Sequence, residues 1–176
     1  MNGVRSLKPY WEHLHYVLVT ESANVSNEDV LGLRGVGHLE LRHCQYVTDK
    51  ALSALSELST LTLFGCARIT GTGLSALNHL TLSKCSLGNE GLSALGQVQT
   101  LSLFHCNNIT DISALGGVDT LDINYCSGVR DVSALGTVHH LTLSWCANIG
   151  DVSALRHVHT LRLEKCNNMT GLSNLG

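Results

Sequence analysis

Net charge and long apolar runs are both scarce in this sequence. Its 176 residues carry 11 basic and 14 acidic side chains, a formal charge of −3 at pH 7. Such a balance gives no electrostatic footprint for nucleic acid. No apolar run approaches the roughly 18 residues that a membrane-spanning helix requires, and residues 1–9 lack the apolar core of a signal peptide. We therefore expect neither a nucleic-acid partner nor a membrane partner.

Catalytic and metal-binding motifs are missing as well. The sequence contains no nucleophile elbow, phosphate-binding loop or metalloprotease helix, although a Ser, Asp, His triad could be assembled from scattered residues. No Cys-x-x-Cys pair is present, whereas zinc sites usually draw ligands from such close pairs. His43–Cys44 and His105–Cys106 are adjacent pairs, and neighbouring strand residues face opposite ways, so neither suits a catalytic dyad. We expect no enzyme activity, catalytic residue, metal ligand or cofactor.

What the sequence does contain is a regular series of cysteines. Seven recur at intervals of 22, 19, 21, 20, 20 and 20 residues, at Cys44, Cys66, Cys85, Cys106, Cys126, Cys146 and Cys166. A period of about 20 residues is typical of a solenoid, in which each repeat buries its apolar face only against its neighbours. Free cysteine behaves as a small buried apolar side chain. We interpret the series as a structural ladder; redox-sensitive thiols and a metal site are the alternatives.

Each repeat has the same internal pattern. In residues 118–137, Leu121 and Ile123 flank one polar residue, which predicts a short strand with both apolar side chains inward. The segment after Cys126 then returns the chain to the start of the next strand. A repeat of about 20 residues leaves room there only for turns or short 3₁₀ pieces.

The return segments differ along the chain. Residues 49–58 have helical spacing and good helix formers, which predicts helices in the first return segments. The connection into the Cys85 repeat is shorter than its counterparts, so we expect a local kink there, and Ser22 stands where a cysteine would fall and adds a further repeat. In the later repeats, an aspartate suited to a turn or cap is followed two residues later by serine, at Asp111, Asp131 and Asp151.

These repeats resemble leucine-rich repeats over about residues 14–175. Leu101, Leu103 and Cys106 match the cysteine-containing form of the pattern, which is similar to the repeats of F-box-type ubiquitin-ligase adaptors. Residues 109–115 are similar to the compact repeats of internalin-like proteins. The resemblance implies an α/β fold: a single curved leucine-rich repeat solenoid of about eight repeats. Its parallel β-sheet would form the concave face, and short helices or 3₁₀ turns the convex face.

The resemblance also implies a function and a domain layout. Residues 1–13 are expected to form an N-terminal cap region and residues 14–176 the repeat domain. The implied function is a non-enzymatic scaffold that binds another protein through its concave face, of which a substrate-recognition module is one form. Seven reduced thiols fit a reducing compartment, so we expect a cytoplasmic location.

The alternative function is a structural or assembly protein that stacks its repeats end to end. The last repeat of a solenoid has no neighbour to cover its apolar face. We therefore expect self-association through an uncapped C-terminal end, formed by Leu161, Leu163, Met169, Leu172 and Leu175.

Outward strand positions supply the candidate binding residues. Aromatic residues make up only 5% of the chain, yet several face out of the predicted strands or precede a cysteine. Aromatics are enriched at interface hot spots, so contact with a partner is one interpretation, and packing over the end of the strand is the other. The Ser and Thr columns are interpreted as plain solvated surface. The candidate partner-binding residues are Phe64, Phe104, His105, Asp122, Tyr125, His140, Trp145 and Arg162.

Overall fold

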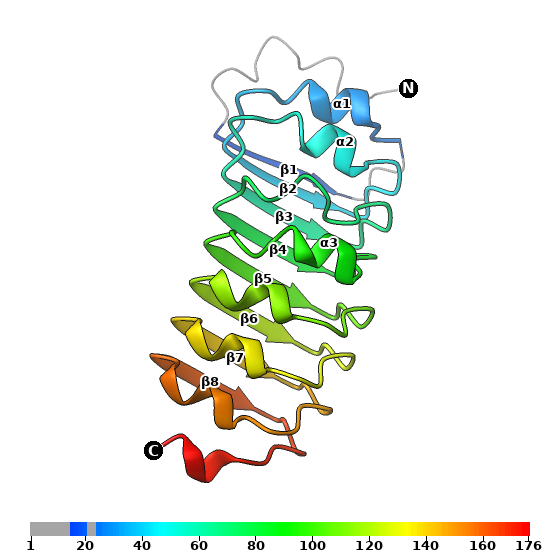
Figure 1. Ribbon diagram of the computed structural model, residues 1–176. Helices are drawn as coiled ribbons and strands as arrows, with labels where there is room; N and C mark the ends of the chain where they lie inside the picture. The colour runs from blue at the N-terminus through cyan, green and yellow to red at the C-terminus, as the bar shows by residue number, and fades with distance from the viewer. Residues whose placement is uncertain (1–14, 21–23) are drawn as a thin grey trace.

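A single parallel sheet organises the molecule. The computed structural model describes residues 15–20 and 24–176. Eight strands follow one another in chain order, so β1 and β8 lie at opposite ends of the stack (Figure 1). Each strand has five residues: β1 (Tyr16–Thr20), β2 (His38–Arg42), β3 (Thr60–Phe64), β4 (His79–Ser83), β5 (Thr100–Phe104), β6 (Thr120–Asn124), β7 (His140–Ser144) and β8 (Thr160–Glu164).

The strands pair without any shift in register. Leu61 of β3 lies beside Leu39 of β2 and Leu80 of β4, and the same alignment continues through every neighbouring pair. Because side chains alternate along a strand, the second and fourth residues of each strand, all aliphatic, point into the core and the other three point outward. Leu61 and Leu63 are completely buried, whereas Thr62 between them is partly exposed. The period-two pattern in the sequence predicted this arrangement, and the structure confirms it.

The return segments cover the inner side of the sheet and change in type along the chain (Figure 1). The early ones hold one-turn α-helices: α1 (Asn27–Leu31), α2 (Asp49–Leu52) and α3 (Asn89–Ser93). The later ones hold 3₁₀ turns, as predicted: η2 (Ser113–Gly117), η3 (Ser133–Thr137), η4 (Ser153–His157) and η5 (Leu172–Asn174).

Early helices were predicted correctly, but their extent was not. The helical pattern of residues 49–58 extends well past Leu52, where α2 ends. Leu55 and Leu58 are buried in the turns that follow. The chain must reach the start of β3 at Thr60, and a longer helix would leave it short of that point because each helical residue advances only about 1.5 Å.

Polar side chains tie the return segments together. Asp111, Asp131 and Asp151 each accept a hydrogen bond from the backbone N–H of the serine two residues later, which confirms the turn role among the two predicted for them. These bonds hold the pKa of Asp111 and Asp131 below the usual range. In the earlier repeats, an Asn or Asp side chain accepts from the backbone N–H of a threonine in the following repeat, for Asn27 with Thr48, Asp49 with Thr70 and Asn89 with Thr110.

The short connection before Cys85 alters the return segment and leaves the sheet unchanged. Residues 71–78 contain turns and no helix, and Gly71 and Gly73 adopt φ values of +97° and +86°. Every residue of β4 pairs one-to-one with β3 and β5. The expected kink therefore does not appear in the strand register, because glycine conformations absorb the missing residues outside the sheet.

The cysteines form a buried ladder, as predicted. All seven are free and buried. The thiol of Cys106 donates to the carbonyl of Phe104 in its own repeat and to that of Leu82 in the preceding repeat, both at 3.6 Å. Cys66, Cys85, Cys126, Cys146 and Cys166 repeat this pair of contacts. Each thiol thus fills the core and satisfies a carbonyl where the chain leaves its strand.

The structure describes the C-terminal end of the stack but only part of its N-terminal end. Residues 1–14 and 21–23, which include the predicted cap region and Ser22, lie outside the described residues. At the other end, Leu161 and Leu163 of β8 are only partly buried, and Leu172 is 52% exposed. The expected apolar edge at the last repeat is therefore present; self-association through it stays a prediction.

Burial of the cysteine ladder predicts slow thiol chemistry. Burial raises the pKa of Cys85 to about 12, whereas hydrogen bonding with Cys44 lowers the pKa of the Cys66 thiol, so burial is what protects Cys66 from a bulky reagent. We expect seven titratable thiols in denatured protein and labelling by a bulky reagent at least about 100-fold slower in native protein. Fast native labelling of several cysteines, or stoichiometric zinc by elemental analysis, would contradict the structural role.

Candidate functional site

The residue before each cysteine has a left-handed backbone. His43, Lys84, His105, Tyr125, Trp145 and Lys165 have φ between 51° and 56°, and Gly65 has φ of 63° in the same column. This conformation costs a non-glycine residue about 1–2 kcal/mol. It is held by the sheet, because the N–H at this position bonds to a carbonyl in the next repeat: Tyr125 donates to Ser144 and Trp145 to Glu164. The side chains are consequently aimed along the rim where the strands end.

Three of these side chains stack into an aromatic ladder, a name used below for His105, Tyr125 and Trp145. The ring centroids of His105 and Tyr125 are 4.6 Å apart, and those of Tyr125 and Trp145 are 5.3 Å apart with planes only 9° from parallel. The ammonium of Lys165 lies 6.0 Å from the Trp145 ring. The rings cover one another's faces, so these aromatics pack at the rim. Trp145 nevertheless remains 49% exposed, and contact with a partner stays a prediction.

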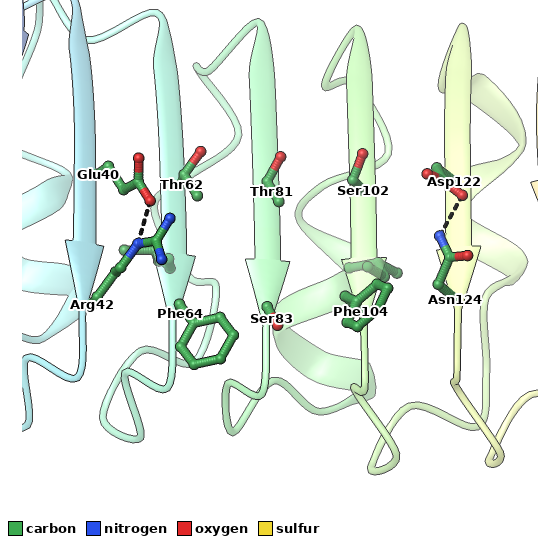
Figure 2. A pocket seen from close by; sticks show the side chains of 12 residues that line it. Glu40, Arg42, Thr62, Phe64, Thr81, Ser83, Ser102, Phe104, Asp122 and Asn124 are labelled. Atoms are coloured by element: carbon green, nitrogen blue, oxygen red, sulfur yellow. Dashed lines mark hydrogen bonds and ion pairs between the residues drawn. The ribbon is translucent and has the colours of Figure 1, made fainter. Parts of the chain in front are cut away.

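Beside the ladder, the concave face has a central hollow of about 350 Å³. Phe64 and Phe104 stand on either side of Ser83, one strand apart in each direction (Figure 2). Asp122 and Asn124 of β6 close one end, and Glu40 and Arg42 of β2 close the other. The floor between them consists of the outward hydroxyl residues Thr62, Thr81 and Ser102. The name central hollow is used below for this site.

The two ends of the central hollow differ electrostatically. Glu40 accepts hydrogen bonds from the Tyr16 hydroxyl and from Arg42, and the Tyr16 bond is the main reason that its pKa is lowered. At the other end, burial raises the pKa of the Asp122 carboxyl, despite a hydrogen bond from the Asn124 amide. One end therefore holds a compensated ion pair, and the other a half-buried carboxylate.

A buried hydroxyl without a partner lies in the middle of the hollow. Ser83 is 7% exposed, and its Oγ is the one fully buried side-chain oxygen or nitrogen in the described part of the chain that has no hydrogen-bond partner. Buried polar groups in folded proteins are nearly always paired. Phe64 and Phe104, which line the hollow on either side of Ser83, supply no polar side-chain group of their own.

The structure divides the eight predicted binding residues into separate groups. Phe64, Phe104 and Asp122 line the central hollow, and His105, Tyr125 and Trp145 form the aromatic ladder. Phe104 joins the two groups, because its ring lies 4.8 Å from His105 and 5.3 Å from Tyr125.

The other two predicted residues are placed differently. His140 is the first residue of β7 and contacts His139 and His159, at the opposite end of the strands. Arg162 is on β8, where it donates to Glu164, and it lies in the same column of outward residues as Asp122, whose charged form it favours.

Sequence analysis missed Ser83 and the paired polar residues of the hollow. The serine and threonine columns were interpreted as plain solvated surface, yet Ser83 is buried and lines the site. A signal was present, because Phe64, Ser83 and Phe104 occupy one column in three consecutive repeats. A small residue between two large ones in such a column marks a depression.

Other kinds of site find little support in the geometry. Within residues 15–20 and 24–176, no group of three or more His, Cys, Asp or Glu side chains is arranged to hold a metal ion. Among those residues there is also no helix long and apolar enough to cross a membrane. The concave face is therefore the candidate site.

Comparison with known proteins agrees with this architecture. The family model described as leucine-rich repeat matches residues 38–56 and 77–96. The crystal structure of internalin InlF from Listeria monocytogenes superposes with a TM-score of 0.72 at 22% identity, over 92% of this chain. The fold is a leucine-rich repeat solenoid.

A second solved structure gives the same result. Internalin C2 of Listeria monocytogenes has a TM-score of 0.58 at 20% identity, with 89% of this chain and 83% of that chain covered. The chain spans 53% of the InlF structure. No curated protein sequence matches this chain.

The left-handed column makes Gly65 sensitive to substitution. A Cβ at this position would lie 2.6 Å from Nδ1 of His43, and φ is already +63°. We expect Gly65→Ala to lower the free energy of unfolding by about 1–3 kcal/mol. Gly150→Ala is the matched control, because its Cβ would meet open space; it should change stability by less than about 0.5 kcal/mol. Equal effects in urea unfolding would show that the left-handed column carries no strain.

Burial of Asp122 predicts a pH-dependent stability difference. Its raised pKa means that the folded state holds the proton more tightly, so stability is lost as pH rises through that pKa. Asp122→Asn should therefore be more stable than wild type near neutral pH, and the difference should disappear below the pKa. Asp119→Asn, which removes an exposed carboxylate, is the control. Urea unfolding of the wild type and both variants, near neutral pH and below the pKa of Asp122, checks this. A lower stability of Asp122→Asn than of wild type near neutral pH would contradict it.

Proposed function

We propose that this protein is a non-enzymatic scaffold that binds another protein through its concave face. The observation that carries the proposal is the continuous surface formed by the central hollow and the aromatic ladder. Phe104, at their junction, is 38% exposed, and Trp145 is 49% exposed. Aromatic side chains supply a large share of the binding energy in protein interfaces. An exposed aromatic cluster on a sheet face otherwise lined by hydroxyl, amide and charged residues supports a docking surface.

The size of the face favours a protein over a small molecule. Eight strands spaced about 4.8 Å apart, with five residues of about 3.3 Å each, give an area of roughly 600 Å². A standard protein interface takes about 800 Å² from each partner. The concave face supplies most of that area, and the loops beside the ladder would supply the rest.

Two finer assignments belong to this proposal. The cysteine-containing repeats resemble those of ubiquitin-ligase adaptors, which supports a role as a substrate-recognition module. Seven free, buried thiols fit a reducing compartment and support a cytoplasmic location. Nucleic acid and membranes are not among the proposed partners, since the formal charge is only −3.

A second candidate function is assembly through the last repeat. Leu161 and Leu163 are only partly covered there, and Leu172 is 52% exposed. The outer edge of β8 also carries backbone groups that can pair with another strand. Another copy of the chain could cover this edge by end-to-end stacking, which predicts association that grows with protein concentration.

Affinity capture with a matched pair of variants tests the scaffold. Replacing Phe104, Tyr125 and Trp145 together by alanine should release bound partners, since hot-spot aromatics contribute about 1–3 kcal/mol each. The protein should remain folded by circular dichroism, because these side chains lie on the surface. Tyr46→Ala is the control: this tyrosine is 57% exposed but lies in the turn after β2, away from the ladder.

The outcomes separate the two candidate functions. Mass spectrometry identifies the captured partners. Loss of partners from the triple variant, with the same partners retained by Tyr46→Ala, would support binding through the concave face. Identical partners on the wild type and the triple variant would refute it. Concentration-dependent mass in light scattering, abolished by appending a polar capping repeat, would support end-to-end assembly instead.

A further inference from the structure

The central hollow has the features of a site for one particular chemical group. Ser83 lines it, and the Ser83 Oγ is closed off from solvent without a hydrogen-bond partner. A buried hydroxyl in this state destabilises the free protein, because its interactions with water have been lost and not replaced. The hydroxyl can gain a partner if a neighbouring side chain turns and a polar ligand enters. The ligand should therefore present hydrogen-bond donors or acceptors to the floor of the hollow.

The walls of the hollow favour a flat ligand group. Phe64 and Phe104 are on β3 and β5, with Ser83 of β4 between them (Figure 2). Two strand spacings separate the phenylalanine backbones, about 9.6 Å in all. Carbon atoms in contact lie about 3.5–4.0 Å apart, so there is room between the two positions for a single planar group but not for a second layer.

The charges favour a cation. Asp122 closes one end of the hollow, and in the described part of the chain Asn124 is the one residue that donates a hydrogen bond to its carboxylate. Of the nearby cations, Arg42 pairs with Glu40, and Arg162 pairs with Glu164 while also favouring the charged form of Asp122. A half-buried carboxylate of this kind binds a donor-rich cation better than an anion or an apolar group.

The protein's own side chains show that cations are drawn to these rings. The ammonium of Lys84 lies 5.3 Å from the centroid of Phe64, and that of Lys165 lies 6.0 Å from Trp145. Attraction between a cation and the face of an aromatic ring accounts for both positions. Phe104, whose ring contacts those of His105 and Tyr125, has no such lysine among the described residues.

We infer that the central hollow receives an arginine side chain of the partner protein. The guanidinium is planar, stacks on aromatic faces and carries five donors, whereas the lysine ammonium is compact and strongly hydrated. It would lie against Phe104 and Phe64, donate to the Asp122 carboxylate and supply the donor that Ser83 Oγ lacks. This inference rests on the proposed function, because it names what the concave face recognises in a protein.

Matched short peptides test the inference. The probes are blocked five-residue peptides whose central residue is arginine, citrulline, lysine or leucine, flanked by serine and glycine. We expect the arginine peptide to bind with a dissociation constant in the millimolar range, as a single anchoring residue should, and citrulline to bind at least about fivefold more weakly. Backbone resonances of Ser83, Phe104 and Asp122 in nitrogen-15 correlation spectra should shift on titration.

Variants assign the effect to particular atoms. Asp122→Asn should abolish the preference for arginine over citrulline, whereas Asp119→Asn, an exposed carboxylate outside the hollow, should leave it intact. Ser83→Ala should weaken arginine binding severalfold while leaving the melting temperature unchanged or higher, because it removes an unpaired buried hydroxyl. A purely structural role for Ser83 would instead lower the melting temperature and leave binding unchanged.

Each remaining outcome decides the matter. Citrulline or leucine peptides that bind as tightly as the arginine peptide would overturn the inference, as would equal effects of Asp119→Asn and Asp122→Asn. If the arginine preference is absent while the alanine triple variant still loses its captured partners, the scaffold stands and the arginine site is wrong. If the triple variant keeps its partners, the proposed function itself fails, whatever the peptides show.

Discussion

In-register stacking of the inward aliphatic residues is the constraint on which the rest of the molecule depends. Leu61 packs between Leu39 and Leu80, and each strand repeats this arrangement with its two neighbours. A core residue in such a stack contributes to two interfaces at once, so deleting its side chain opens a cavity between three repeats. The return segments are free to be α-helical, 3₁₀ or irregular because the stack, not the connection, sets the spacing.

The same register creates the outer surface. Identical positions of successive repeats stand in straight columns, about one strand spacing apart, so the chemistry of the face depends on what each column holds. One column brings Phe64, Ser83 and Phe104 together and forms the hollow. The residues of another column have a left-handed backbone, which turns their side chains to the rim, and three of their rings stack there. Neither surface exists within one repeat; both arise from alignment between repeats.

The features that recur in every repeat could be predicted from the sequence. The features that depend on contacts between neighbouring repeats could not. The cysteine period and the Leu-x-Leu pattern predicted the strand order, the inward residues and the buried thiols, because these are fixed by the core. The length of α2 was wrong because helical spacing continues to residue 58, while the chain has to turn after Leu52 to begin β3. The aromatic residues were found, but their stacking was not predicted, because it depends on the backbone of residues such as Tyr125 and not on residue type. Ser83 was missed because burial of a hydroxyl depends on the two neighbouring repeats.

Stacking of Trp145 on Tyr125 gives this surface an optical property of its own. The chain has only two tryptophans, and the indole of Trp145 lies half-exposed at the rim, one ring away from Tyr125 and next to the charged end of Lys165. Indole emission responds to the polarity of its surroundings, so it registers whether water or another molecule covers the ladder. Occupancy of the concave face can thus be followed by intrinsic fluorescence, without attaching a dye to the surface.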